Sequence, residues 1–305
     1  MMKKLIFLAI GLFAGVNVIT AGSENVNTFS IRTPKFVRPL IERWVSEYNK
    51  VNTHANVLIE NGIGENSSAL QLVLDDNSVS DGNAVVYFGQ YAILPVTTRG
   101  SEAEHIIGGK ALNDKKLKNL YFRQNELDAL ENGKKKVVDV NVYAGNSKSS
   151  VSKIYASYLG EDDANYRGKR ISGDDAFLNI AISKDVKGVT INALPNIFDL
   201  QSRKLKSNLV ILPLSMKKEY ADDLSSNADL DKTISLLENE KIEGVPIEKI
   251  GFSFDMNNST IRDFVNWIIS NGTTLNHAYG LLNLNDKTLV IQKQKLGNNF
   301  LTAQK

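Results

Sequence analysis

Short apolar runs alternate with helix-like repeats along most of this chain, and this alternation restricts its fold more than any other feature. The clearest repeat comes after Thr33-Pro34, where apolar residues recur at three- and four-residue spacing: Val37, Leu40, Ile41, Trp44, Val45 and Tyr48. This spacing predicts a helix with one buried face, with Thr33 as its N-cap. Pro39 should kink the helix or confine its regular part to the residues after the proline. Strand and helix patterns in alternation predict an α/β architecture.

Several predicted helices begin directly after a predicted strand. The sequence predicts strands at 55–60, 85–88, 91–96 and 137–143, and helices at 114–122, 149–159 and 174–183. We also expect a second helix from about Ser67-Ser68, after the Gly-rich turn 61–65, and a late helix that Ser259 caps and Gly272 ends. Such helix starts present unpaired backbone N–H groups and a positive dipole end, which favour anions.

The N-terminal residues have the pattern of a secretory signal peptide. Lys3 and Lys4 precede the apolar run 5–16, and Ala21 offers a small residue at the cleavage point. The run is shorter than the roughly 20 residues that span a bilayer, which argues against a membrane anchor. No cysteine follows it, so a lipid anchor of the bacterial lipoprotein kind is excluded. We therefore expect residues 1–21 to be removed and the protein to be periplasmic.

The charge of the chain is balanced once this signal is removed. The full sequence has 36 basic and 34 acidic residues, a net charge of +2, and the signal contains two lysines and no acid. A global field suited to nucleic acid or an anionic membrane is therefore absent. Any attraction for anions must be local. The sequence contains no cysteine, which excludes disulfides, thiolate zinc sites and cysteine nucleophiles.

No enzyme signature stands out in the sequence. His54, His105 and His277 lie far apart without a carboxylate partner at telling spacing, and Gly62-x-Gly64 lacks the third glycine of a dinucleotide fingerprint. A hydrolase is supported only by the many serines. Adjacent acid pairs rarely converge on one metal ion and suit turns or caps better: Asp75-Asp76, Asp162-Asp163, Asp174-Asp175 and Asp222-Asp223. We predict no catalytic residue, no metal and no cofactor.

The order of these pieces resembles the periplasmic phosphate-binding proteins of ABC transport systems, within the type II periplasmic binding protein superfamily. The likeness extends over most of residues 28–290. Residues 33–44 are similar to the family's first helix, with its internal proline and tryptophan, and residues 62–72 to the turn that opens its second helix. Ser149-Ser150-Val151 aligns with the family's Ser-Gly-Thr helix start, and residues 264–280 with its C-terminal helix and closing strand.

This resemblance implies two α/β lobes with mixed sheets flanked by helices, joined by a hinge, with an oxyanion held between them. Lobe 1 would comprise 22–97 and 250–305, and lobe 2 would comprise 98–249. The ligand-binding residues that it implies are Arg32, Thr33, Ser67, Ser68, Lys148, Ser149 and Ser150.

The family's ligand-binding motifs are degenerate in this chain. Ala144-Gly145 stands where the family usually has an arginine, and Val151 replaces the threonine of Ser-Gly-Thr. The family's Ser-Asp pair has no secure counterpart, with Ser80-Asp81 as the nearest candidate. Lys148 or Arg32 could supply the missing positive charge, although a lysine lacks the bidentate fork of an arginine.

Two functions remain open for such a chain. The first is a monomeric periplasmic solute-binding protein that captures phosphate or a related oxyanion and delivers it to the membrane permease of an ABC importer. The second is a scaffold that has lost ligand binding and serves as an envelope interaction or sensor module with a protein partner. Plain helix capping is an alternative role for each serine named above.

Overall fold

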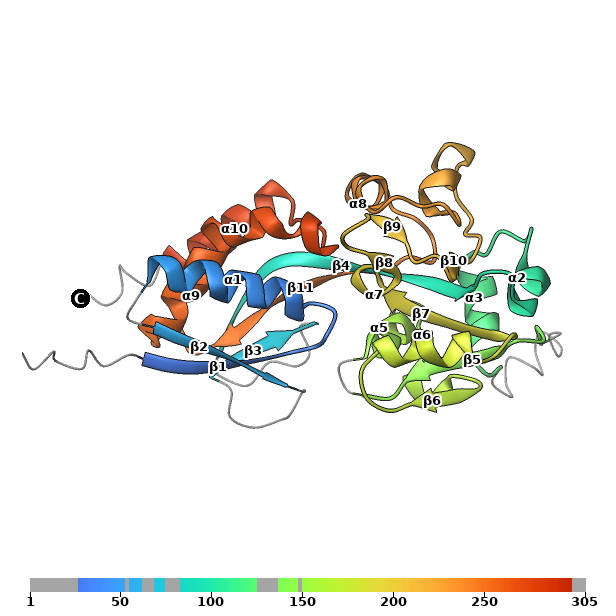
Figure 1. The fold of residues 1–305 in the computed structure, drawn as a ribbon, viewed down its shortest axis with the longest axis horizontal. Helices are drawn as coiled ribbons and strands as arrows, with labels where there is room; N and C mark the ends of the chain where they lie inside the picture. Colours follow the sequence, from blue (N-terminus) through green and yellow to red (C-terminus); the bar gives the residue numbers. More distant parts are fainter. Residues whose placement is uncertain are drawn as a thin grey trace, which may run out of the picture.

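The molecule has two lobes that share one continuous sheet (Figure 1). The computed structural model describes residues 27–52, 55–61, 69–74, 83–124, 137–147 and 150–297. In these ranges the strands follow the order β2-β1-β3-β11-β4-β7-β5-β6, and β10 also pairs with β4. The α/β architecture predicted from the alternating patterns is confirmed. Within the described ranges, no helix is long and apolar enough to cross a membrane.

The first lobe contains the N-terminal strands and the C-terminal helices. Its strands are β1 (Asn27–Thr33), β2 (Ala55–Asn61), β3 (Leu70–Val73), β11 (Ile247–Phe254) and the first part of β4 (Ala84–Thr98). Its helices are α1 (Arg38–Val51), α9 (Ser259–Ser270), α10 (Asp286–Gly297) and the short 3₁₀ segments η4 (Gly272–Leu275) and η5 (His277–Tyr279). β1 is parallel to both β2 and β3, whereas β11 is antiparallel to β3 and β4.

The second lobe is formed by the middle of the chain. Its strands are β5 (Asn141–Gly145), β6 (Lys169–Ile171), β7 (Gly188–Ala193), β8 (Phe198–Asp199), β9 (Lys204–Leu205) and β10 (Leu209–Ile211). Its α-helices are α2 (Glu102–Ile107), α3 (Asp114–Tyr121), α5 (Val151–Tyr158), α6 (Ala176–Ser183), α7 (Leu194–Ile197) and α8 (Leu230–Asn239). Its described residues also include two 3₁₀ segments, η2 (Asp163–Asn165) and η3 (Lys218–Leu224).

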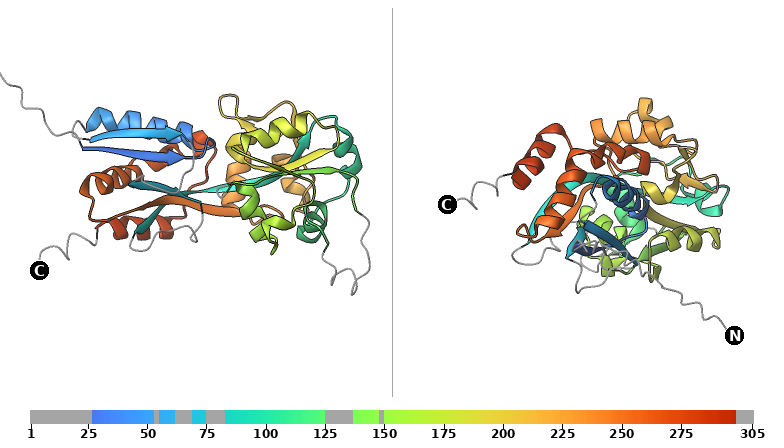
Figure 2. Two further views of the ribbon diagram at one scale, coloured as in Figure 1. Left: turned by 90° about the horizontal axis from the view of Figure 1, so that it is seen from below. Right: turned by 60° about the vertical axis from the view of Figure 1, so that its left-hand side comes forward.

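The long strand β4 runs through both lobes. Residues 84–92 pair with β11 in the first lobe, and residues 93–97 pair with β7 in the second. Figure 2 shows β4 and β11 passing side by side along the connection between the lobes. The sequence predicts two strands here, at 85–88 and 91–96, and the structure joins them into one. Because β4 pairs with strands of both lobes, the backbone and its hydrogen bonds run without a break from one lobe into the other at this point.

The core of the first lobe is aromatic. The Trp44 ring is fully buried and meets Phe88 edge-on, with ring centroids 4.8 Å apart. Its indole Nε1–H donates to the Gly272 carbonyl at 2.8 Å, so the polar atom is paired inside the core. A Cβ on Gly272 would lie 2.8 Å from that nitrogen, which explains why a glycine suits this position. The predicted stripe of residues 37–48 is therefore the buried face of α1.

The start of α1 differs from the prediction. The helix begins at Arg38, after a turn over 35–37, and Thr33 is the last residue of β1. Thr33 donates its hydroxyl to the Pro34 carbonyl at 3.1 Å, so its predicted role as N-cap is wrong. Pro39 lies in the first turn, where a missing N–H costs no intrahelical bond. Of the two expected effects of Pro39, a kink or confinement of the helix to later residues, the structure is closer to the second, because the helix begins at Arg38, one residue before the proline.

The second predicted helix is also wrong where the structure describes it. Residues 70–73 form β3, which fits between β1 and β11. Leu70 and Val73 are buried, and the strand completes hydrogen bonding between two sheet segments that would otherwise present open edges. Likewise, α9 is capped by Asn258, whose side chain accepts from Ile261 N, rather than by Ser259. Residues 271–280 form the 3₁₀ segments η4 and η5 instead of the expected closing strand.

Candidate functional site

The start of α5 already holds a negative charge supplied by the chain itself. Ser150 is the N-cap of α5 and is 1% exposed. Its hydroxyl donates to Asp175 Oδ1 at 2.5 Å, and the Val151 backbone N–H donates to Asp175 Oδ2 at 2.8 Å. The next amide, of Ser152, donates to Ser150 Oγ. The first backbone donor of this helix is therefore satisfied by a carboxylate and the second by the hydroxyl oxygen of the N-cap, and a negative charge is favoured at this positive end of the helix dipole.

The Asp175 carboxyl group is buried, and its neighbours make room for it. The residue is 7% exposed, and burial raises the pKa of the carboxyl group to about 6, although the bonds from Ser150 and Val151 favour the charged form. A Cβ on Gly145 would overlap the Ser150 hydroxyl and lie 2.6 Å from Asp175 Oδ1. Because Gly145 has no side chain, the Asp175 carboxylate has room beside it.

The neighbouring Asp174 makes contact with the first lobe. Its Oδ2 accepts from the Lys35 backbone N–H at 3.1 Å, in the turn that leads into α1. Its Oδ1 accepts from Ala176 N at 2.9 Å and so also serves the start of α6. The Lys35 Nζ lies 5.0 Å from the Phe177 ring centroid, a second contact between the same two segments. Two adjacent carboxylates thus receive donors from the entry turn of α1 and from the start of α5.

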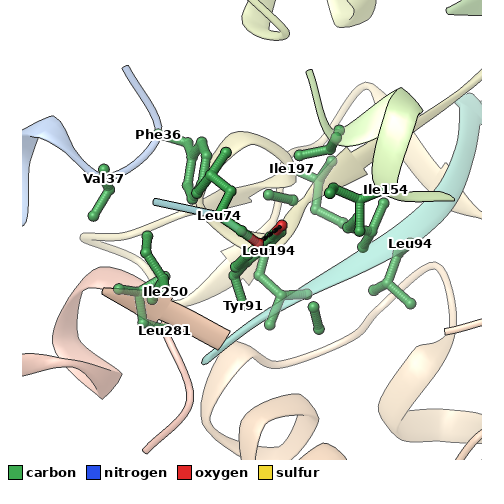
Figure 3. Packing of buried hydrophobic residues seen from close by; sticks show 14 of the residues in the cluster. Phe36, Val37, Leu74, Tyr91, Leu94, Ile154, Leu194, Ile197, Ile250 and Leu281 are labelled. Atoms are coloured by element: carbon green, nitrogen blue, oxygen red, sulfur yellow. Dashed lines mark hydrogen bonds between the residues drawn. The ribbon is translucent and has the colours of Figure 1, made fainter. Parts of the chain in front are cut away.

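Apolar side chains from both lobes pack together in one buried cluster (Figure 3). Phe36, next to Lys35, is 4% exposed and lies 5.7 Å from Tyr91 between ring centroids. Tyr91 donates its hydroxyl to the Leu74 carbonyl at 3.1 Å. Ile154 of α5 and Leu194 of α7 belong to the same buried cluster. The core therefore continues from one lobe into the other.

A second polar contact joins the lobes on another side. His277 Nε2 lies 2.8 Å from Glu238 Oε1 of α8, and the same oxygen accepts from Asn283 N at 2.6 Å. The bond to Glu238 raises the pKa of His277, and the pKa of Glu238 is lowered even though burial opposes this. Arg203 donates to the His277 and Ala278 carbonyls at 2.8 and 3.1 Å. We call these residues the His277 clasp.

The structure places the predicted ligand-binding residues in three different situations. Arg32 Nε forms an ion pair with Glu60 Oε2 at 2.6 Å across β1 and β2, and the bond from Arg32 lowers the pKa of Glu60. Its charge is matched by this partner. Thr33 is 3% exposed, and its hydroxyl donates to the Pro34 carbonyl. The Ser150 hydroxyl donates to Asp175. The remaining four predicted residues lie outside the described residues: Ser67, Ser68, Lys148 and Ser149.

Sequence reasoning missed the importance of Asp174 and Asp175. An adjacent acid pair after a Ser-Gly turn predicts a turn or a cap, and the pair does precede α6: Asp175 is its N-cap residue, and Asp174 accepts from Ala176 N. What the pattern could not show is that the same pair lies against two other helix starts, because α1 and α5 are distant in sequence. Across the described ranges, no group of three or more His, Asp or Glu side chains could hold a metal ion.

Several solved structures share the fold of this chain. An ABC-type phosphate transport receptor from Vibrio cholerae matches with a TM-score of 0.57 at 11% identity, over 85% of this chain and 100% of that chain. A putative phosphate ABC transporter substrate-binding protein with bound phosphate from Clostridium perfringens matches with a TM-score of 0.55 at 14% identity, over 85% and 100%. A possible phosphate binding protein from Planctomyces limnophilus matches with a TM-score of 0.50 at 9% identity, over 89% and 98%.

These likenesses define the class of fold. The chain has the two-lobe type II periplasmic binding protein fold, with mixed sheets flanked by helices. The neighbours above are described as a phosphate transport receptor, a putative phosphate ABC transporter substrate-binding protein and a possible phosphate binding protein. The sequence itself matches no protein-family model and no curated protein. The fold predicted from the resemblance is confirmed.

Proposed function

We propose that this protein is a periplasmic solute-binding protein that captures phosphate or a related oxyanion between its lobes. It delivers the anion to the membrane permease of an ABC importer, acts as a monomer and performs no chemistry on its ligand. The proposal includes removal of the signal peptide 1–21. One observation carries it above the rest: backbone and hydroxyl donors from two lobes, at Lys35, Ser150 and Val151, converge on one pair of carboxylates.

Convergent donors of this kind suit a tetrahedral oxyanion. Hydrogen bonds to a charged acceptor are roughly twice as strong as those between neutral groups. Helix starts supply them without net positive charge, which fits a chain whose basic excess belongs to its signal. The fold neighbours support the same ligand class, since two of them are described as phosphate transport proteins.

A thermal-shift series on the mature protein tests this function. Phosphate, sulfate, molybdate and organic phosphates are added singly to protein purified in oxyanion-free buffer. A ligand at 100 times its Kd adds about 2.7 kcal/mol to the stability of the native state, so at least one should raise the melting temperature in a saturable way. An unchanged melting temperature with every oxyanion rejects the proposal.

A second function is favoured by the burial of Asp175. If the carboxylate never leaves the start of α5, the scaffold needs no solute and can serve as an envelope interaction or sensor module. Its Ser150 and Val151 donors are already used. This function predicts no oxyanion effect in the thermal-shift series, together with a reproducible cross-link to one envelope protein in intact cells. Saturable oxyanion binding with no such cross-link contradicts it.

A further inference from the structure

One dipeptide of the second lobe takes donors from both lobes at once. Asp174 accepts the Lys35 N–H of the first lobe, and Asp175 accepts the Ser150 hydroxyl and the Val151 N–H of α5. In a two-lobe binding protein, a ligand that contacts both lobes holds them together. Here the Asp174 carboxylate makes the contact between the lobes, and the adjacent Asp175 carboxylate occupies the donors at the start of α5 within the second lobe.

We propose that Asp174-Asp175 is a tethered anion that holds the two lobes together without any solute and competes with a free oxyanion for the same donors. The competition with a free oxyanion rests on the proposed function, whereas the contact between the lobes does not. The contact between Lys35 Nζ and the Phe177 ring adds to the same latch. We call Lys35, Asp174, Asp175 and Phe177 the aspartate latch.

Tethering gives the carboxylates a strong advantage over a free anion. A group held on the same chain acts at an effective concentration of about millimolar or more, without the cost of association. A free oxyanion could not join the pair, because like charges in one site repel. It must displace the latch, so its apparent affinity falls in proportion to the fraction of molecules in which the donors are open.

The second lobe holds the dipeptide in position from behind. The Asp175 carbonyl accepts from Asn192 Nδ2 at 2.8 Å, and Asn192 is fully buried in β7. The Asp174 side chain is tied to the start of α6 through Ala176 N. Since these bonds lie within the second lobe, the contact to Lys35 is the one that opening of the lobes would break. Asp174 and Asp175 would therefore stay fixed in the second lobe when the lobes open, and only the contact to Lys35 of the first lobe would be lost.

The absence of native cysteine allows a direct distance measurement. Ser46→Cys on α1 and Lys115→Cys on α3 place one spin label on each lobe, at exposed positions. Distances are measured by pulsed electron paramagnetic resonance in oxyanion-free buffer. We compare the labelled protein with labelled Asp174→Ala/Asp175→Ala, which removes both acceptors, and with Asp162→Ala as a control, since Asp162 caps η2 within the second lobe.

The labelled wild-type protein should show one narrow distance distribution, and the control should match it. The double variant should show a longer and broader distribution, because it lacks the contact between Asp174 and Lys35 that limits opening on this side of the molecule. If the folded double variant retains the wild-type distribution, the proposal is overturned. Should its circular dichroism show unfolding, Asp174→Ala alone decides in the same way, because Asp174 is the residue that contacts Lys35. No oxyanion is present, so these results are separate from the test of the proposed function.

Discussion

At Asp175, burial and hydrogen bonding act on the carboxyl group in opposite directions. Burial prevails and raises the pKa to about 6, above the ordinary value of 3.8. The folded state therefore binds this proton more tightly than the unfolded state. Consequently, the contribution of this group to stability is greatest below pH 4 and is lost as the pH rises through 6. The difference between the ordinary pKa of 3.8 and the pKa of about 6 in the folded protein corresponds to about 3 kcal/mol in the free energy of unfolding.

Asp175→Asn should therefore remove a pH dependence of stability. The free energy of unfolding of the wild-type protein minus that of the variant should fall by up to about 3 kcal/mol between pH 4 and pH 7. Urea titrations across this range measure the difference. Asp162→Asn, at an exposed cap, serves as the matched control. A difference that stays constant with pH contradicts the raised pKa of Asp175.

Gly145 is a second residue on which the latch depends. Gly145→Ala would place a Cβ against the Ser150 hydroxyl and Asp175 Oδ1, and overpacking of this kind costs about 1–3 kcal/mol. Gly297→Ala is the matched control, since nothing lies within 4 Å of the position of its Cβ. Chemical denaturation should show a loss for the first variant and a near-neutral effect for the second. Equal stability of the two variants would refute the packing described here.

At the scale of elements, the cap of α9 distinguishes the structure from the sequence prediction. Asn258 accepts from Ile261 N at 3.1 Å, whereas Ser259 is the first helical residue. Asn258→Ala should lower the free energy of unfolding by about 1 kcal/mol, and Ser259→Ala should change it much less. The same denaturation experiment gives both values. A larger loss from Ser259→Ala would support the sequence prediction instead.

Local patterns predicted the elements whose signal is contained in a single segment. The buried stripe of α1, strand 55–60 and helix 114–122 were predictable from spacing alone, and each is observed within a few residues of its predicted bounds. β3 was not predictable, because its four residues form a strand only through pairing with β1 and β11. The latch was hidden for a similar reason: Lys35 and Asp174 are 139 residues apart.

At the scale of the whole molecule, the described residues supply two sets of polar contacts between the lobes in addition to β4 and the shared core: the aspartate latch and the His277 clasp. The predicted lobe boundaries at 97/98 and 249/250 stay predictions. From the pairing of β4 first with β11 and then with β7, we propose that the first crossing lies near residues 92–93. A crossing at that point would put the hinge close to Tyr91, inside the apolar cluster of Figure 3.

The His277 clasp should loosen as the pH rises. Glu238 raises the pKa of His277, Asp231 acts in the same direction, and burial and Arg203 oppose it. The bond is therefore strongest while His277 is protonated and Glu238 is ionised, and it weakens as the pH rises through the raised pKa. Melting temperatures should show His277→Gln further below the wild-type protein at pH 6 than at pH 8.5. His105→Gln, at an exposed position, is the control. A gap that does not change with pH contradicts the clasp.

Phosphate affinity shows most directly whether the aspartate pair occupies an oxyanion site. Calorimetric titration with inorganic phosphate compares the wild-type protein with Asp174→Ala/Asp175→Ala, after circular dichroism has shown that both are folded. We predict that the variant, with its donors open, binds phosphate at least about tenfold more tightly than the wild-type protein, because no tethered carboxylate has to be displaced. Equal or weaker binding by the folded variant would contradict occupation of the site by the aspartate pair.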